Sequence, residues 1–403
     1  EVGQQDTAPP ELPPSLDLHF DWDAVEVYHQ EWRFDHSAWR NLLHVDLLEL
    51  RRLAFRTVKH VGKRHHMQTR LAKMMIQALS THFQVLKEPM ETPGRAQRLQ
   101  IITVFRYLLP SLLLSYGGAS GTGNINRASC FQRVETLQGF DELRLHLIAS
   151  AKAQRCRPVV VASEERTRKK AAELMHQLGG MRKASQMLAS LLRLAPATEA
   201  TLTQMREKHP LARIPRGAER DAEVAAALTR AAIVREEENT EAKWDWESHQ
   251  RALKEAVTKA SNHAAPGPEG LRYSHLRDAC LSSASGPRLL ALMTEEWLLL
   301  QDSPDLFGEL YMDLYMSAIL CALGVEKPRP LGCGTTLRRI YASANMCLKK
   351  QHFAEMFAQV GQFAVGQPCG VELAAAYVQA HHHTGGICVK VDGANAFNAA
   401  CRV

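Results

Sequence analysis

Apolar side chains recur at intervals of three and four residues in several parts of the sequence, and this spacing constrains the fold more than any other feature. One such series runs from Leu43 to Val58, and another from Leu337 to Leu348. Residues at this spacing lie on one face of an α-helix. We therefore expect helices over both segments and a chain that is mostly helical.

The composition is that of a folded protein of ordinary polarity. Hydrophobic residues make up 45% of the 403 residues and charged residues 23%, as in soluble globular proteins. A chain of this length has room for about two or three domains. The 49 Lys and Arg residues exceed the 43 Asp and Glu residues and give a net charge of +6. This mild excess permits a nucleic-acid partner without requiring one.

Hydropathy argues against a membrane span, and the cysteines argue against a disulfide scaffold. No segment offers about 18 consecutive apolar residues, and the best one, 104–114, contains Arg106 and Pro110. The nine cysteines include no CxxC pair, which is unlike a zinc site or a disulfide-rich secreted domain. We therefore expect an intracellular protein, with the nucleus and the cytoplasm both open, and no membrane partner.

Proline content and charge divide the chain into three parts. Residues 1–20 are polar and proline-rich, as in an extended linker. Residues 21–240 are expected to form a mostly helical region. Within it, a dense series of Lys and Arg between 51 and 73 forms either a solvated helix face or a face that contacts phosphates. A boundary near Trp244 separates this region from residues 245–403.

The third part contains one turn and three helices that can be recognised locally. Residues 264–270 have the Pro and Gly content of a rigid turn, and they lead to a short helix around Ser274 to Cys280. An apolar series predicts a second helix from Arg288 to Leu300. A third helix follows Thr335 or Thr336, one of which is the expected N-cap residue.

A short strand is expected near the end of the chain. Ile387, Val389 and Val391 alternate with polar or small residues, which is the period of a strand with one buried face. Asp392 then comes at the strand end on the open face. An acidic residue in such a place is commonly a structural cap or a surface residue, and spacing alone gives it no other role.

Four segments of the last third, taken together, carry a family resemblance. Residues 390–398, with Arg402 four residues on, resemble the first catalytic motif of reverse transcriptases of non-LTR retrotransposons. Residues 329–332 resemble the fingers motif of the same enzymes. Residues 362–372 are similar to their next block, Gln-x-Gly followed by Gly-x-Glu, and residues 267–276 resemble a motif further upstream. Each segment is weak alone, but the four occur in the order of the family.

The resemblance implies a right-hand polymerase. The fold class would be α-rich α+β: a helical N-terminal region, then the fingers and the first palm strand in residues 245–403, with an incomplete palm and no thumb. The activity would be that of an RNA-directed DNA polymerase, a nucleotidyltransferase that uses an RNA template, a DNA primer and deoxynucleoside triphosphates. Magnesium would be the cofactor, because two divalent ions activate the primer hydroxyl and neutralise the pyrophosphate charge.

The resemblance also assigns roles around the predicted strand. Asp392 matches the metal-binding aspartate of the palm, and it is therefore the candidate catalytic residue and Mg²⁺ ligand. Val391 and Gly393 would lend backbone groups to the incoming triphosphate or its metal. Phe397 matches the aromatic gate that blocks a ribose 2′-hydroxyl, and its ordinary alternative is a core phenylalanine.

Two cations complete the predicted nucleotide site. Arg329 matches the fingers arginine that grips the triphosphate, and a forked guanidinium suits phosphate oxygens. Lys327 is a second cation at that place, or else an ordinary surface lysine.

The sequence also departs from the family pattern. Ala364 stands where the family usually has Gly. The aromatic-x-Asp-Asp motif that completes the metal site does not occur, and Asp392 is the last acidic residue before Val403. The chain begins with Glu1 and lacks a signal pattern. We therefore expect a fragment that is inactive as it stands.

Two other functions remain open at this point. The chain can be a catalytically dead retroelement remnant that acts at most as a nucleic-acid-binding protein. Alternatively, Asp35 and His36 are similar to an Asp-His pair of metal-dependent nucleases, although the supporting acidic and Asn motifs are not apparent in the sequence.

Overall fold

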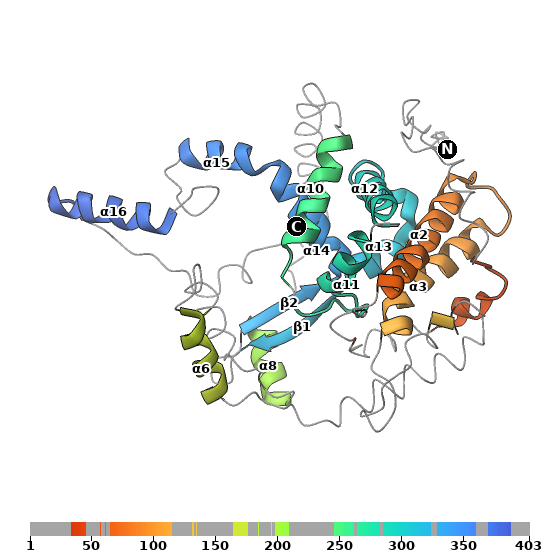
Figure 1. The fold of residues 1–403 in the computed structure, drawn as a ribbon, viewed down its shortest axis with the longest axis horizontal. Coiled ribbons are helices and arrows are strands. Elements are labelled where there is room, and N and C mark those ends of the chain that lie inside the picture. The colour runs from red at the N-terminus through yellow and green to blue at the C-terminus, as the bar shows by residue number, and fades with distance from the viewer. Residues whose placement is uncertain are drawn as a thin grey trace, which may run out of the picture.

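The structure, a computed structural model, is dominated by helices. It describes residues 34–45, 57, 61, 65–114, 131–132, 134, 164–175, 184, 195, 198–208, 246–261, 264–282, 285–323, 329–359 and 370–387. Of these residues 76% are helical, and their strands form one two-stranded sheet (Figure 1). The prediction of an α-rich chain with little strand is therefore confirmed for the described residues. No described helix is long and apolar enough to cross a membrane.

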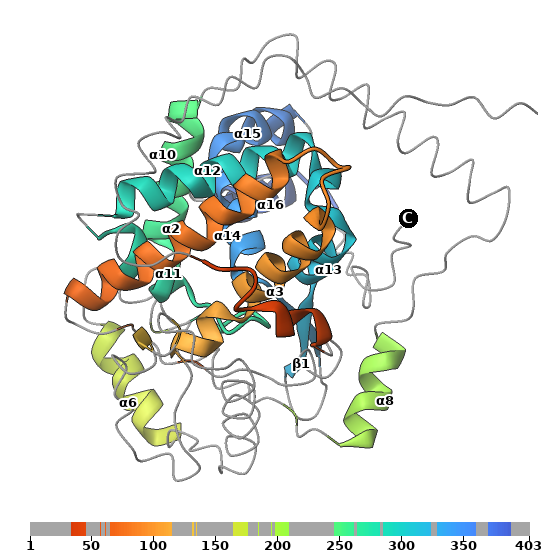
Figure 2. The ribbon, with the colours of Figure 1, turned by 90° about the vertical axis from the view of Figure 1, so that its right-hand side faces the viewer.

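Two helices from the first half of the chain form a hairpin that packs on the second half. These are α2 (His65–Lys87) and α3 (Arg95–Leu114). The interior of α3 is almost wholly apolar and buried, apart from Arg106. Helix α2 runs alongside α12 (Gly286–Asp302), as Figure 2 shows.

Five helices and a 3₁₀ turn make up the described core of the second half. The three helices predicted there are confirmed, with ends displaced by a few residues at most. The elements are α10 (Trp246–Lys259), α11 (Tyr273–Cys280), α12, η3 (Pro304–Phe307), α13 (Gly308–Met316) and α14 (Thr336–Leu348).

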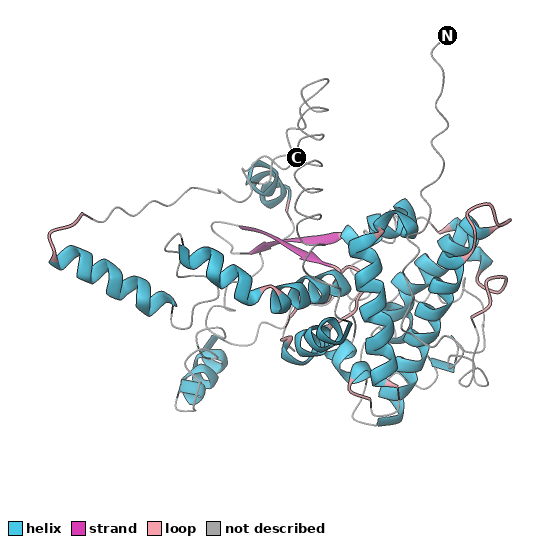
Figure 3. Ribbon diagram, turned by 90° about the horizontal axis from the view of Figure 1, so that it is seen from above, coloured by secondary structure: helices cyan, strands magenta, loops and turns pink. Residues whose placement is uncertain are grey.

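A β-hairpin follows α13, and Figure 3 shows its two strands among the helices. Strand β1 (Ala318–Leu323) pairs antiparallel with β2 (Arg329–Gly334). The register places Ala318 opposite Gly334 and Leu323 opposite Arg329. The backbone amide of Ala195 also donates to the carbonyl of Ala322 in β1 at 2.9 Å.

Three further described helices contribute no buried residue to the hydrophobic cluster. They are α6 (Glu164–Met175), α15 (Lys350–Gln359) and α16 (Gly370–His383). A fourth, α8 (Glu199–Lys208), packs on β2. Helix α16 exposes several large apolar side chains, including Leu373, Tyr377 and Val378.

One hydrophobic cluster includes residues of both halves of the chain. It unites α2 and α3 with α10 to α14, and it includes the stacked rings of Phe34 and Trp39, which pack on Phe105. Residues 209–245, where we predicted a domain boundary, lie outside the described part, so that boundary stays a prediction.

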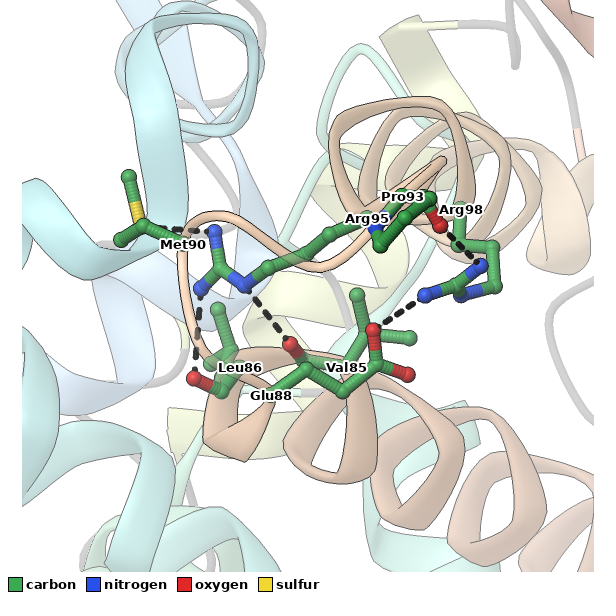
Figure 4. Close-up of polar contacts among 7 residues, drawn as sticks. All are labelled: Val85, Leu86, Glu88, Met90, Pro93, Arg95 and Arg98. Atoms are coloured by element: carbon green, nitrogen blue, oxygen red, sulfur yellow. Dashed lines mark hydrogen bonds and ion pairs between the residues drawn. The ribbon is translucent and has the colours of Figure 1, made fainter.

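Two arginines at the start of α3 bind the end of α2 and the segment that connects the two helices (Figure 4). Arg95, which is 4% exposed, donates to the carbonyls of Val85 (3.1 Å) and Leu86 (3.2 Å) in the last turn of α2 and contacts the Met90 sulfur. A cation at this place satisfies carbonyls that the helix leaves without a partner and suits the negative end of its dipole. Arg98 makes an ion pair with Glu88.

Two local predictions differ from the structure. The helix expected from Leu43 to Val58 is not continuous, because a short 3₁₀ helix ends at His44 and Val45 has an extended backbone. Apolar spacing alone did not reveal this break. Ile387 was expected on the buried face of a strand, but it lies outside any strand and is 86% exposed. The rest of that strand lies outside the described residues.

Candidate functional site

A tight turn at residues 267–271, here called the Glu269 turn, is buried at the centre of the second half. The amide of Gly267 donates to the carbonyl of Leu271, and the amide of Gly270 donates to that of Gly267. Gly270 has a φ of +82°, which a residue with a side chain adopts only with strain. A Cβ on Gly267 would lie 2.1 Å from the Glu269 carboxylate, so a larger residue there would make that carboxylate shift.

Three hydroxyl groups from three parts of the chain bind successive carbonyls of the Glu269 turn. Ser111 of α3 donates to the carbonyl of Glu269 at 2.8 Å, and Thr57 donates to that of Gly270 at 2.5 Å. Thr336 donates to the carbonyl of Leu271 at 2.8 Å. All three bonds are buried, where an unpaired carbonyl would be costly. They hold the turn against α3 and the start of α14.

The carboxylate of Glu269 caps α14. The predicted N-cap position is confirmed as Thr335, but its hydroxyl donates to the carbonyl of Tyr315 (2.8 Å) and not to the helix. The first helical amide, that of Thr336, instead donates to Glu269 Oε1 at 2.7 Å. Burial raises the pKa of Glu269 to about 7, against the opposing effect of the hydrogen bonds from Thr336.

Arg339 adds a cation beside this turn. Its guanidinium lies over the ring of Tyr273, 4.8 Å from the ring centroid, and donates to the carbonyl of Ala265 at 3.0 Å. Arg339 belongs to α14, whereas Tyr273 begins α11. The segments 264–276 and 335–339 therefore contact one another through a carboxylate, one hydroxyl and a guanidinium.

A buried ion pair lies between the two halves of the chain. Arg106 of α3 pairs with Glu296 of α12 at 2.5 Å. Glu296, which is fully buried, also accepts from the hydroxyls of Tyr311 (2.7 Å) and Tyr341 (2.8 Å). One carboxylate thus receives donors from α3, α13 and α14, as a buried charge requires.

The protonation states of the groups around Glu296 follow from their burial and from the charges beside them. Burial alone would lower the pKa of Arg106, but the facing Glu296 outweighs it and the pKa is raised. Burial and the Glu296 charge raise the pKa of Tyr311 and of Tyr341. His82 of α2 contacts the Arg106 guanidinium, and burial together with that cation lowers its pKa well below the usual range. Arg106 is the cation here, and His82 is neutral.

A cavity of about 90 Å³ lies among α2, α3, α12, α13 and the Glu269 turn. It is large enough to hold several water molecules. Most of its walls are apolar, and both the Glu269 turn and the Arg106–Glu296 pair border it. The lining residues are Leu71, Met75, Ala78, Leu79, Thr103, Arg106, Tyr107, Leu109, Pro110, Glu269, Leu271, Met293, Glu296, Tyr311, Leu314, Tyr315, Thr335 and Leu337.

Most residues predicted from the family resemblance lie outside the described part of the chain. This holds for Lys327 and, as a group, for Val391, Asp392, Gly393 and Phe397. The backbone of Arg329 is described: it is the first residue of β2 and faces Leu323. Lys327 belongs to the connection between the two strands, two positions before Arg329.

No metal site occurs among the residues that the structure describes. No group of three His, Cys, Asp or Glu side chains there could hold an ion, and the Mg²⁺ site on Asp392 stays a prediction. The Asp35 carboxylate accepts from the amide (2.8 Å) and the hydroxyl (2.5 Å) of Ser37, which lowers its pKa and makes it a turn cap. These contacts give the proposed nuclease pair with His36 no support.

Comparison with known proteins identifies no relative. No family model matches the chain, and neither the curated proteins nor the solved structures include a significant match.

Several residues of the site were not found from the sequence. Glu269 lies in a segment of the resemblance, but nothing local indicates that it caps a helix 67 positions later. Arg106 gave the clearest signal, because a single arginine inside an apolar helix needs a buried partner. Its partner Glu296 lies 190 positions away, and the sequence does not indicate which acid it is.

Proposed function

We propose that this chain supplies the fingers and the first palm strand of an RNA-directed DNA polymerase of a retrotransposon. In this role it binds an RNA template, a DNA primer and a deoxynucleoside triphosphate. Asp392 holds Mg²⁺, and Arg329 and Lys327 bind the triphosphate. The proposal comes from the four segments that resemble reverse transcriptases of non-LTR retrotransposons.

One structural observation supports this proposal most. Two of the four segments, 267–276 and 329–332, are about 60 positions apart in sequence. The first includes the Glu269 turn, and the second lies in β2, directly before Thr335 and Thr336. Thr336 binds both the Glu269 carboxylate and the Leu271 carbonyl. The helix that follows the second segment is thus bonded to the first segment, which is consistent with the two segments belonging to one functional unit.

The hairpin gives a second, weaker support. Arg329 begins β2, and Lys327 lies in the connection that precedes it. The two cations are thus two positions apart in the sequence. An arginine can bind two phosphate oxygens at once, and a lysine can neutralise a third.

The first test measures nucleotide binding by the 403-residue chain itself. Magnesium and a labelled deoxynucleoside triphosphate are titrated in the presence of an RNA–DNA hybrid. Arg329→Gln should weaken nucleotide binding by about 10- to 100-fold, the loss expected for hydrogen bonds to a charged group. Lys254→Gln, which removes an exposed cation of α10, is the matched control and should bind normally.

The second test concerns catalysis, and it needs a polypeptide that carries an aromatic-x-Asp-Asp motif after residue 403. Asp392→Ala should abolish primer extension and leave binding of the RNA–DNA hybrid unchanged. Extension that survives this substitution would refute the role of Asp392. Binding of the hybrid with no nucleotide binding in any form of the chain would instead favour a nucleic-acid-binding protein without polymerase activity.

A further inference from the structure

Met90, in the connection between α2 and α3, is the most exposed methionine among the residues that the structure describes. It is 72% exposed, compared with 52% for Met316 and 6% for the buried Met67. Oxidation of a thioether by a peroxide requires that the reagent reach the sulfur atom, so susceptibility follows exposure. Met90 is therefore the described methionine that an oxidant in solution reaches most readily.

The Met90 sulfur differs from an ordinary exposed thioether because it contacts a guanidinium. Arg95 Nη1 donates to Met90 Sδ at 2.9 Å, as Figure 4 shows. The guanidinium itself is held in place, because its Nε and Nη2 donate to the carbonyls of Val85 and Leu86 and Arg95 is buried. A fixed cationic donor thus meets a flexible side chain whose sulfur is only a weak acceptor.

Oxidation would replace this weak acceptor with a strong one. A sulfoxide oxygen is polar, whereas a thioether sulfur accepts hydrogen bonds poorly. Hydrogen bonds from a charged donor are stronger than those between neutral groups. Because Met90 is unbranched and exposed, its sulfoxide can turn toward Arg95 without any movement of the helices. The product would therefore bind the same guanidinium more tightly than the thioether does.

We propose that Met90 is a site of reversible oxidation by hydrogen peroxide, and that its sulfoxide binds Arg95 and strengthens the connection between α2 and α3. A lone pair of the sulfur attacks one peroxide oxygen, so that the S–O bond forms and the O–O bond breaks. The displaced hydroxide takes the proton from the sulfur-bound oxygen and leaves as water. Sulfur loses two electrons and the peroxide gains them. Methionine sulfoxide reductases restore the thioether.

The expected effect on stability is opposite to the usual one, and it does not depend on the proposed polymerase function. Sulfoxide formation commonly weakens a protein because it makes a packed apolar side chain polar. Met90 is not part of the hydrophobic cluster of the described residues, so little packing is lost there. The added hydrogen bond from Arg95 should then stabilise the hairpin of α2 and α3.

Peptide mapping of the whole chain tests the site of oxidation. The folded protein is treated with hydrogen peroxide, quenched and digested with trypsin. Peptides 88–95, 340–349 and 65–70 carry Met90, Met346 and Met67 as their only methionines. Met90 should oxidise at least as fast as the half-exposed Met346 and about ten times faster than the buried Met67, and sulfoxide reductases should restore peptide 88–95. Oxidation of Met90 as slow as that of Met67, or a product that the reductases leave unchanged, would overturn the proposal.

Urea unfolding before and after peroxide treatment tests the bond to Arg95. Met90→Leu cannot form a sulfoxide, whereas the other methionines oxidise alike in both proteins. Relative to its effect on Met90→Leu, oxidation should lower the unfolding equilibrium constant of the unsubstituted protein by about three- to tenfold, the contribution of one hydrogen bond. Met346→Leu is the matched control and should retain the full difference. An equal effect of oxidation on the unsubstituted protein and Met90→Leu would show that the sulfoxide does not bind Arg95.

Discussion

Glu269 Oε1 accepts a 2.7 Å hydrogen bond from the backbone amide of Thr336, 67 positions later in the chain. Both residues are buried, Glu269 at 5% exposure and Thr336 at 0%. Water cannot replace the bond, and the start of α14 therefore depends on a carboxylate from another segment. This single contact couples the geometry of the Glu269 turn to that of the segment following β2.

Burial of this carboxylate predicts a pH dependence of stability. The pKa of Glu269 is raised from 4.5 to about 7, and that of Glu295 of α12 is likewise raised to about 7 by burial. Between about pH 4.5 and 7 the folded state then binds more protons than the unfolded state, so the free energy of unfolding falls as pH rises through this window. For Glu269 the shift corresponds to about 3 kcal/mol. Urea unfolding at pH 5 and pH 8 measures the difference.

Amide variants identify the carboxylates responsible for that slope. Glu269→Gln keeps an acceptor for the Thr336 amide and removes the titration, so it should flatten the dependence in part. Adding Glu295→Gln should flatten most of what remains. Glu255→Gln, which changes an exposed acid of α10, should retain the full slope. An unchanged slope in the Glu269→Gln/Glu295→Gln double variant would contradict the prediction.

The Arg106–Glu296 pair predicts a large and non-additive loss of stability. Arg106→Leu leaves the Glu296 charge buried without its cation, and we expect a loss of about 3–5 kcal/mol in the free energy of unfolding. Adding Glu296→Leu removes that charge, so the double variant should lose less than the sum of the two single losses. A double-mutant cycle by denaturant unfolding measures the coupling.

An exposed pair provides the control for this cycle. Lys259 and Glu255 form an i,i+4 ion pair on the surface of α10. Lys259→Gln should leave the melting temperature unchanged, because exposed pairs contribute little. Additive losses at Arg106 and Glu296 would mean that the buried pair does not act as a unit.

Sequence patterns predicted the helices of the second half, because apolar spacing and N-cap residues depend only on residues that are close in the sequence. Tyr341 and Ala344 are buried on the face that their spacing indicated. The β-hairpin was not predicted, since the run of β1 is apolar throughout and lacks the alternation of a half-buried strand. The series from Leu43 to Val58 was misleading for the opposite reason, because helical spacing occurs there without a continuous helix.

The candidate site was harder to predict because long-range contacts build it. The Glu269 turn itself was expected from its Pro and Gly residues. Its binding to Ser111, Thr57 and Thr336 depends on how α3 and α14 pack, and no local pattern encodes that packing. The Thr335 position followed from the end of the apolar series, but the group that caps the helix did not.

The proposed polymerase function makes a prediction for Phe397. If its ring excludes a 2′-hydroxyl, Phe397→Ala should lower the preference for deoxynucleotides over ribonucleotides by at least about tenfold, which corresponds to roughly 1.4 kcal/mol of discrimination. The ratio of kcat/KM for the two nucleotides measures it, in a polypeptide that carries the aspartate pair. Phe357→Ala, a change on α15, should leave the ratio unchanged. A constant ratio in Phe397→Ala would make Phe397 a core residue.

Gly267 allows the sharpest test of the Glu269 turn. A Cβ at this position would lie 2.1 Å from Glu269 Oε2 and 2.6 Å from Oε1, so Gly267→Ala makes the carboxylate shift, and we expect its bond to the Thr336 amide to be lost. The loss should be about 2–3 kcal/mol, the cost of a buried hydrogen bond to a charged group together with local strain. Gly332→Ala is the matched control, because its Cβ would meet no atom within 4 Å. Equal stability of the two variants in denaturant unfolding would mean that the turn can relax and that the Glu269–Thr336 bond does not hold the segments together.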